Sequence, residues 1–467
     1  MELNKVKYKR HVKPLDTSEK PCKSWHFLTW FVNKLGRHLM RGKIKKLERI
    51  DMKGLKPPFV ILSNHQTFSD MKINAILTYP YDFHSITSLE GYYGFCGIRG
   101  WLMKRVGCIP KRRFTTDPHL ISSCETILNE YGDILTIYPE AAYSNVGITA
   151  DFPDSYGALI KKLGKPLVIV VHRGNYLRQP FWDWERKRKV KTYTTMKKVL
   201  DVEDIERMTS EEIMDVIRKE LTYNEYKYQK ENNIVIDEPW RAEGLHKVLY
   251  QCPHCKKEHQ MLSRGITLWC MNCGKRWIMT ELGEMRAQNG KTEFTHIPDW
   301  YNWEKENVKR EVEAGEYHFD DEVDVYSMPN PKQFIPLGKG FLKHSLENGM
   351  TLDGYYNNHS YKISRPSRGL YNIHIEYNYC FKRRDPCIQI SVADNTFVCY
   401  TSKKDVVTKV YFATLAIHEK LMRERLEKKQ LRATREPIVI KASMANGEQI
   451  AMDVSTVDVQ DDNKNQS

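Results

Sequence analysis

The chain has 467 residues, of which 41% are hydrophobic and 11% aromatic, and this indicates a globular protein with one or more sizeable cores. The formal net charge of +14 favours anionic partners, such as a phospholipid surface, nucleic acid or a phosphorylated substrate. No apolar run is long enough to cross a bilayer, and the first residues lack the apolar core of a signal peptide, so we expect a cytoplasmic protein.

The positive charge is concentrated at the N-terminus. The first fifty residues hold fourteen Lys and Arg against four Asp and Glu, a net +10. Residues 1–24 form a basic N-terminal segment that precedes the first predicted element. Seven of the eleven cysteines are scattered without the spacing of a disulfide framework, so we expect reduced thiols.

Residues 25–43 have the pattern of an amphipathic helix. Its apolar stripe consists of Leu28, Phe31, Val32, Leu35 and Leu39. Two tryptophans, Trp25 and Trp30, lie at the flank of that stripe. Lys34, Arg37 and Arg41 serve the polar side of the helix. Two interpretations stay open: the helix lies in the interface of an anionic membrane, or it packs on the core of the protein.

Residues 25–240 alternate short apolar runs with longer helical patterns. The runs "FVIL", "DILTIY" and "KPLVIVV" predict buried strands, and "SSCETILNEYG" and "SEEIMDVIRKEL" predict helices. This alternation is typical of a sheet with crossover helices. We therefore predict an α/β domain with a mixed sheet over this range.

The apolar run at residues 59–62 continues into "SNHQTFSD", which places His65 and Asp70 five residues apart. On one regular helix this spacing would put the two side chains about 140° apart, so they can meet only across a turn. The following "MKINAIL" predicts a helix with Ser69 or Asp70 at its N-cap. The alternative is that Asp70 only caps this helix, and that His65 is an ordinary loop residue.

Four blocks of this domain resemble, in order, those of the glycerolipid acyltransferase superfamily, which includes the lysophosphatidate acyltransferases. "SNHQTFSD" resembles the first block, NHxxxxD. "GCIPKRR", "IYPEAAYS" and "KPLVIVVHRG" resemble the second, third and fourth blocks. Each motif alone is weak, and their correct order makes the resemblance stronger over about residues 50–173.

The resemblance implies an acyl-transfer site. His65 is expected to take the proton of the acceptor hydroxyl, and Asp70 to orient its ring and stabilise the imidazolium. The residues expected to bind the substrate are Asn64, Lys111, Arg112, Arg113 and Glu140. Arginines of the second block are expected to hold the acceptor's phosphate. The alternatives are a solvated basic loop at residues 111–113 and a purely structural carboxylate at Glu140.

Two of the four blocks depart from the family pattern. Where the third block usually reads Gly-Thr-Arg after Pro-Glu, this chain has Ala141, Ala142 and Tyr143. The fourth block has His172 and Arg173 in place of its usual proline. An arginine that commonly contacts the phosphate is therefore missing, and an acceptor other than lysophosphatidate stays open.

Residues 246–280 contain two Cys-x-x-Cys pairs separated by fourteen residues. The four cysteines are Cys252, Cys255, Cys270 and Cys273. This pattern resembles a zinc ribbon, in which four thiolates fill the tetrahedral shell of a structural Zn²⁺. The alternatives are a redox dithiol and a chance cluster of cysteines.

Residues 281–435 contain many short aromatic and β-branched runs, such as "NIHIEYNY" and "CIQISVADNTFVCYT". One long helical stretch follows, from Asp405 to about Leu431. This order predicts a β-rich C-terminal domain in which an antiparallel sheet is closed by a helix, similar to a pleckstrin-type barrel. Residues 436–467 form a tail whose polar end we expect to be disordered.

Together these features predict an O-acyltransferase of phospholipid biosynthesis or remodelling. It would move a fatty acyl group from acyl-CoA or acyl carrier protein to the hydroxyl of a lysophospholipid, such as 1-acylglycerol-3-phosphate. We expect it to lie peripherally on an anionic membrane surface, and we do not expect nucleic acid as a partner. The alternative is a protein that binds nucleic acid or another protein through its ribbon and has a non-catalytic acyltransferase-like domain.

Overall fold

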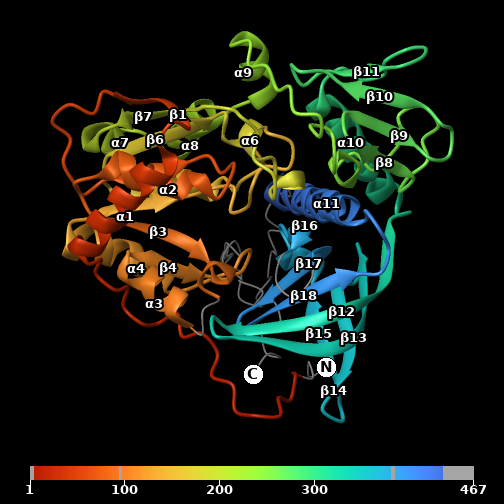
Figure 1. Ribbon diagram of the computed structural model, residues 1–467. Coiled ribbons are helices and arrows are strands. Elements are labelled where there is room, and N and C mark those ends of the chain that lie inside the picture. Colours follow the sequence, from red (N-terminus) through yellow and green to blue (C-terminus); the bar gives the residue numbers. More distant parts are fainter. Residues whose placement is uncertain (1–4, 94–96, 380–383, 435–467) are drawn as a thin grey trace, which may run out of the picture. The chain divides into compact units, whose positions relative to one another are not determined.

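The computed structural model describes residues 5–93, 97–379 and 384–434 (Figure 1). The chain divides into two compact units, Met1–Ile417 and His418–Ser467. All three β-sheets lie in the first unit. Among the described residues, no helix combines the length and the apolar character that a bilayer span requires.

The first sheet has seven strands and is mixed. The strands are β1 (Ile44–Ile50), β2 (Val60–Ser63), β3 (Phe83–Ser88), β4 (Cys108–Lys111), β5 (Ile134–Ile137), β6 (Leu167–Arg173) and β7 (Thr192–Leu200). Their order is β1-β7-β6-β2-β5-β3-β4, and only the pairing of β6 with β7 is antiparallel. The three apolar runs that predict strands therefore form the buried centre of this sheet, as parallel strands require. The predicted mixed α/β fold is confirmed.

Helices cover both faces of the first sheet (Figure 1). They include α1 (His26–Met40), α2 (Ser69–Thr78), α4 (Leu120–Glu125), α5 (Ser155–Leu163), α7 (Val202–Arg207) and α8 (Ser210–Leu221). Successive residues of β2 belong to two different cores, since Val60 and Leu62 lie in one apolar cluster and Ile61 in the other. This alternation places α5 and α8 over one face and α2 over the other.

The start of α2 differs from the prediction. Its N-cap is Phe68, not Ser69 or Asp70. The Ser69 N–H donates instead to the Oγ1 of Thr67 (3.1 Å), so a threonine before the cap satisfies one of the free donors of the first turn. The Asp70 carboxylate is thereby left for the turn that precedes the helix.

Two other predicted helices show how their ends are determined. The predicted helix at residues 122–132 consists of α4 and a π-helical turn (Thr126–Tyr131), and it ends at Gly132, whose φ is 67°. Glycine adopts this left-handed conformation without strain. The helix α8 coincides with "SEEIMDVIRKEL", because Thr209 and Glu212 form a capping box at its start.

The second sheet is antiparallel and contains the cysteine-rich segment. Its strands, in the order β11-β10-β9-β8, are β8 (Met261–Arg264), β9 (Thr267–Cys270), β10 (Arg276–Met279) and β11 (Met285–Ala287). Helix α10 (Ile297–Ala314) packs on this sheet, with the rings of Trp300 and Trp277 5.0 Å apart and both fully buried. These two indoles give the small sheet an apolar core of its own.

The third sheet has seven antiparallel strands. They are β12 (His318–Asn330), β13 (Gln333–Ser345), β14 (Gly349–Tyr356), β15 (His359–Arg365), β16 (His374–Tyr379), β17 (Asp385–Val392) and β18 (Asn395–Thr401). Their order is β15-β14-β13-β12-β18-β17-β16, and helix α11 (Val407–Thr434) follows. The predicted antiparallel β-rich region that ends in a helix is therefore confirmed.

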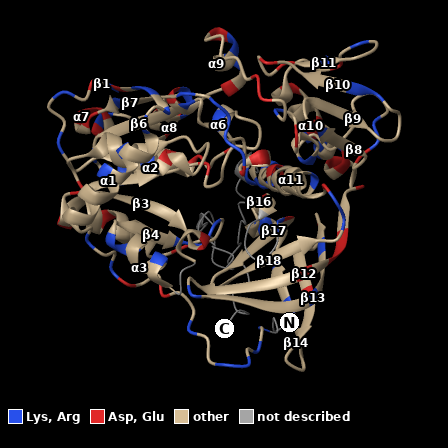
Figure 2. Ribbon diagram, viewed as in Figure 1, with Lys and Arg blue, Asp and Glu red and all other residues tan. Residues whose placement is uncertain are grey.

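The described part of the basic N-terminal segment contacts the third sheet. The hydroxyl groups of Tyr8 and Ser327 are 2.6 Å apart, and the Leu15 N–H donates to the carbonyl of Pro329 (3.1 Å). The chain then continues to α1, with its Lys and Arg residues spread along an outer loop (Figure 2). The segment thus joins the third sheet to the first.

Candidate active site and metal centre

The candidate active site is built on the turn that follows β2. His65 comes two residues after this strand, and Asp70 is the second residue of α2. The His65 Nδ1 and Asp70 Oδ2 atoms are 3.1 Å apart, so the turn brings together two side chains that one regular helix would separate. The carboxyl end of a central parallel strand is also where open α/β sheets usually bind ligands.

Asp70 is fully buried and held from several sides. Its Oδ2 also accepts the N–H groups of Gln66 (2.6 Å) and Thr67 (2.8 Å), and its Oδ1 accepts the side-chain amide of Asn175 (2.6 Å). Burial raises the pKa of Asp70, but the charges of His172 and His65 and the hydrogen bonds from His65 and Asn175 lower it, and the net shift is downward. The ionised carboxylate therefore favours the His65 tautomer that carries its proton on Nδ1.

The His65 ring lies between two tyrosines. Its centroid is 4.2 Å from that of Tyr138 and 4.3 Å from that of Tyr143, and the His65 side chain is 17% exposed. Within the described parts of the chain, no group makes a hydrogen bond to the Nε2 of His65. This nitrogen is therefore available to exchange a proton with a hydroxyl that approaches between the tyrosines.

The Asn64 side chain, which precedes His65, bridges two strands of the sheet. Its Nδ2 donates to the carbonyl of His172 (3.0 Å), and its Oδ1 accepts the His172 N–H (2.8 Å). The two hydrogen bonds tie the end of β2 to the end of β6. The Asn64 amide is buried, and both of its polar atoms are engaged by the backbone of His172.

Glu140 holds the same turn from the third block. Its Oε1 accepts the His65 N–H (3.0 Å) and its Oε2 accepts the Ala150 N–H (2.9 Å). Burial raises the pKa of Glu140 to about 8, against the opposite effect of these two donors. Both oxygens are committed to main-chain groups, which is the structural alternative for this residue.

The three basic residues of the second block lie in three different environments. The Lys111 ammonium donates to the carbonyl of Thr115 (2.9 Å) in its own loop. The Arg113 guanidinium is 3.4 Å from the Glu90 carboxylate, and both side chains are largely buried. The positive charge of Arg113 partly offsets the rise in the pKa of Tyr143 that burial causes, and Arg113 lines one cavity together with His374.

Arg112 is directed away from the site and into the third sheet. It is buried, and burial lowers its pKa to about 10. Its guanidinium donates to three carbonyls and one hydroxyl, those of Met328 (3.1 Å), Pro329 (2.6 Å), Asp394 (3.0 Å) and Thr396 (3.1 Å). The second block is therefore fastened to the third sheet by this one side chain.

Sequence reasoning missed several neighbours of His65. Tyr143 is visible in the sequence only as a departure from the family pattern, and its contact with the histidine could not be foreseen. Asn175, which holds Asp70, has no sequence signal that separates it from other polar residues. His172 is likewise a departure from the fourth block, and its ring donates to or accepts from the Thr194 hydroxyl (3.1 Å).

The four cysteines of the ribbon segment converge on one point. The Sγ atoms of Cys252 and Cys273 are 3.8 Å apart and those of Cys255 and Cys270 are 3.7 Å apart, and all four lie within 4.8 Å of one another. A tetrahedral ion with Zn–S bonds of about 2.3 Å would separate its sulfurs by about 3.8 Å. The cluster therefore fits the predicted zinc ribbon.

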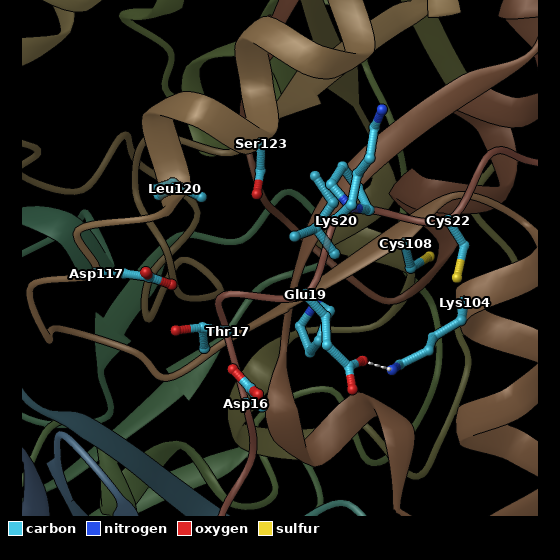
Figure 3. Close-up of a pocket in the computed structure, with 13 residues that line it drawn as sticks. Asp16, Thr17, Glu19, Lys20, Cys22, Lys104, Cys108, Asp117, Leu120 and Ser123 are labelled. Atoms are coloured by element: carbon cyan, nitrogen blue, oxygen red, sulfur yellow. Dashed lines mark hydrogen bonds and ion pairs between the residues drawn. The ribbon is translucent and has the colours of Figure 1, made fainter.

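A surface pocket lies beside the N-terminal segment (Figure 3). Its walls include residues of that segment, of helix α3 (Ile98–Arg105) and of β4, and a salt bridge joins Lys104 to Glu19 there (3.1 Å). Neither His65 nor Asp70 lines it. This pocket is therefore separate from the candidate active site.

Residues 41–173 match the family model described as Acyltransferase. This range contains all four blocks, including His65 and Asp70. The resemblance to acyltransferases that the blocks indicate is therefore confirmed for this segment, and the chain carries an acyltransferase domain. Among solved structures, the chain is similar to the 1-acyl-sn-glycerophosphate (LPA) acyltransferase PlsC from Thermotoga maritima. The identity is 16%, the TM-score is 0.35, and the match covers 41% of this chain and 76% of that one. No curated protein sequence matches the chain.

Proposed function

We propose that this protein is a membrane-associated O-acyltransferase that transfers a fatty acyl group from a thioester to the hydroxyl of a lysophospholipid. The observation that supports it most is the His65–Asp70 pair, with 3.1 Å between Nδ1 and Oδ2 and with no hydrogen bond to the opposite nitrogen from any described residue. This pair lies in the segment that matches the acyltransferase family. The thioester is that of CoA or of acyl carrier protein.

The proposed reaction is a direct transfer without an acyl-enzyme. The Nε2 of His65 removes the proton of the acceptor hydroxyl while the hydroxyl oxygen attacks the thioester carbonyl and forms the new C–O bond. The C–S bond then breaks, and the imidazolium gives its proton to the leaving thiolate. Asp70 keeps the proton on Nδ1 throughout and stabilises the imidazolium that forms between the two steps.

The substrate-binding role is assigned to Arg113. Its guanidinium lies near Tyr143, and a planar guanidinium suits a phosphate oxygen pair. The polar groups of Lys111 and Arg112 are already occupied by carbonyl groups, so we assign these two residues to the support of the loop. Glu140 positions the His65 backbone, and Asn64 ties the end of β2 to β6.

Helix α1 supports docking to a membrane. It packs on α2 through its small and polar face, where the Asn33 amide donates to the Ala75 carbonyl (2.9 Å) and Gly36 lies against Ile76. Much of the apolar stripe points away from the protein. The exposed fractions of three stripe residues are 48% for Phe31, 44% for Leu35 and 42% for Leu39. Of the two interpretations of this helix, these exposures favour the membrane interface.

Helix α3 continues the same surface. Its exposed apolar residues meet α1 where the rings of Trp25 and Trp101 pack edge to face at 5.6 Å, with the Arg105 guanidinium over both rings. We call this surface the apolar face, and its members are Trp25, Phe27, Trp30, Phe31, Leu35, Leu39, Ile98, Trp101 and Leu102. Helices α1 and α3 also carry basic residues (Figure 2). Apolar insertion and attraction to anionic lipids would thus act together.

The four cysteines are proposed to bind one Zn²⁺ with a structural role. Four thiolates complete a tetrahedral shell, so such an ion would have no open position for a substrate. Its contribution would be to the stability of the second sheet and of α10, which packs on it. The proposed chemistry belongs to the first sheet alone.

The experiment that tests the proposed function is an acyl-transfer assay. Wild-type protein and the variant His65→Ala are incubated with acyl-CoA or acyl carrier protein thioester and a panel of lysophospholipids, and the acylated product is quantified. We expect product with the wild type and at least a hundredfold less with the variant, whose circular dichroism should be unchanged. Turnover near the wild-type rate in His65→Ala would refute the proposed mechanism.

A further inference from the structure

A small cavity lies between the second block and the third sheet. Its volume is about 10 Å³, room for one water-sized group. Its walls are formed by the loop after β4 and by strands β15 to β17, and they include Arg113, Arg365, Asn372, His374, Gln389 and Ser391. Arg113, the residue proposed to bind the phosphate, is therefore part of the cavity wall.

Unsatisfied polar atoms surround this cavity. Gln389 is only 3% exposed, and the Nε2 and Oε1 atoms of its side-chain amide lack hydrogen-bond partners among the described residues. The Nε of Arg113 and the Nδ1 of His374 are buried there without partners as well. A buried polar atom without a partner has lost its hydration without compensation, so four such atoms around one cavity indicate a site built for a polar group.

The cavity lies beyond the catalytic pair along a line of aromatic rings. Tyr143 contacts His65, its ring centroid is 5.6 Å from that of Phe181, and Phe181 is 6.5 Å from the ring of His374. In a lysophospholipid the phosphate separates the reacting hydroxyl from the head-group alcohol. An acceptor with its hydroxyl at His65 and its phosphate at Arg113 would therefore direct the head group toward this cavity.

The charges around Arg113 disfavour a phosphomonoester. Arg113 already faces the Glu90 carboxylate. A second acidic residue, Glu376, hydrogen-bonds to His374 (2.9 Å). Burial raises the pKa of Glu376 to about 7, and the charge of Arg113 acts in the opposite direction. The second arginine of the cavity, Arg365, donates to the carbonyls of Ser391, Phe114 and Gly369. One arginine that already faces the Glu90 carboxylate is poorly matched to a dianion, whereas a phosphodiester brings a single negative charge.

We propose that this cavity is a subsite for one hydroxyl group of the acceptor's head group, and that the preferred acceptor is a lysophospholipid whose phosphodiester carries a hydroxyl-bearing alcohol such as glycerol or inositol. This inference rests on the proposed function for the reacting centre. A hydroxyl group both donates and accepts, which matches the free amide N–H and C=O of Gln389. The specificity-determining residues, Gln389 and His374, thus come from the third sheet and not from the acyltransferase domain.

The test compares the wild type with Gln389→Leu, which has a similar shape and no polar atoms. Acyl transfer is measured with lysophosphatidylglycerol, lysophosphatidylinositol and lysophosphatidate. We expect the wild type to favour the first two, and the ratio of their kcat/KM to that for lysophosphatidate to fall about tenfold in Gln389→Leu. Thermal stability should stay the same or rise, because two unpaired buried atoms are removed. The control Tyr361→Phe removes an unpaired buried hydroxyl from β15, outside this cavity, and should leave the ratio unchanged.

Binding separates this inference from the proposed function. Short-chain forms of the same three lipids are titrated into His65→Ala, with and without Gln389→Leu, by calorimetry. A tenfold loss confined to the hydroxyl-bearing lipids supports the subsite, and it does so even if no acyl transfer is found, in which case only the proposed function fails. Preference of the wild type for lysophosphatidate, equal binding by both proteins, or no binding of any of the lipids would show that the cavity holds only water, and the inference would be overturned.

Discussion

Arg112 and Arg113 are neighbours in the chain, yet their guanidinium groups serve different parts of the molecule. Arg112 binds carbonyls of the third sheet, such as that of Pro329 at 2.6 Å, whereas Arg113 faces Glu90 beside the candidate active site. Both were expected to bind the substrate from the resemblance alone. Because their contacts differ, we expect substitutions of the two residues to have different effects.

Arg112→Met should affect stability, and Arg113→Lys should affect substrate binding. The first variant leaves buried carbonyls without donors, so we expect the free energy of unfolding to fall by about 2–4 kcal/mol. The second keeps the charge opposite Glu90 but loses the planar fork, so we expect a KM for the acceptor at least tenfold higher and a nearly unchanged stability. Urea denaturation and steady-state kinetics measure the two effects. Loss of stability in both variants to the same degree would contradict the separation.

Asp70→Asn should reduce turnover by about 10²- to 10⁴-fold through loss of the Nδ1 tautomer of His65. It should also lower the melting temperature, because an amide group would face the N–H donors of Gln66 and Thr67. Kinetics and thermal unfolding are measured together. The control is His119→Ala, an exposed histidine of the same domain, which should change neither property. If Asp70→Asn lowers stability but leaves turnover intact, the aspartate only maintains the turn.

The distance between partners along the chain determines how much of this site can be predicted from the sequence. His65 and Asp70 are five residues apart and meet through one turn, so a local pattern is enough to suggest their pairing. The cysteine pairs are similarly local. Glu140 lies 75 residues from the backbone group that it holds, and Arg112 lies 216 residues or more from its partners. The Glu140 contact arises because β5 lies beside β2 in the first sheet, and the Arg112 contacts arise because its loop packs on the third sheet. No local pattern encodes either arrangement.

Helix α1 shows a second limit of sequence reasoning. The amphipathic pattern predicts the helix and its apolar stripe, but hydrophobicity alone suggests that the stripe is the buried face. The face that packs is chosen by close approach: Gly36 brings the helix against Ile76, and Asn33 adds a hydrogen bond to α2. Small residues therefore direct the contact, and the stripe is left exposed.

Metal analysis should find one Zn²⁺ per chain after purification under reducing conditions. Cys252→Ser should lose the metal and lower the melting temperature, because three thiolates no longer complete the shell. Cys22→Ser, which changes a cysteine outside the cluster, is the matched control and should keep one equivalent. Metal-free protein with unchanged stability would contradict the zinc ribbon.

His172 should make the protein sensitive to acid. Burial lowers its pKa from 6.5 to about 4, so the folded state binds the proton more weakly than the unfolded state. The stability that His172 contributes is therefore fully present above about pH 6.5, and it is lost as the pH falls toward 4. The total change corresponds to roughly 3 kcal/mol. Urea denaturation at several pH values should show a smaller loss in His172→Gln, which has no titrating ring. Identical pH profiles for the two proteins would contradict this assignment.

The apolar face should decide between a membrane and nucleic acid as the anionic partner. The protein should sediment with vesicles of phosphatidylcholine and phosphatidylglycerol, and binding should weaken with salt but keep a residual part through the buried apolar side chains. The triple variant Phe31→Ser, Leu35→Ser and Trp101→Ser should lose that residual part. The control is Leu262→Ser with Tyr355→Ser, two exposed residues outside the apolar face, and it should bind as the wild type does.

Binding to RNA or DNA would depend on the salt concentration in a different way. Counterion release makes the logarithm of the affinity fall linearly and steeply with the logarithm of the salt concentration, with little apolar remainder. The triple variant should then behave as the wild type toward nucleic acid, because its charges are unchanged. Tight binding of nucleic acid at physiological salt, together with failure to bind vesicles, would favour the alternative in which the basic surface and the ribbon serve a nucleic-acid-binding protein.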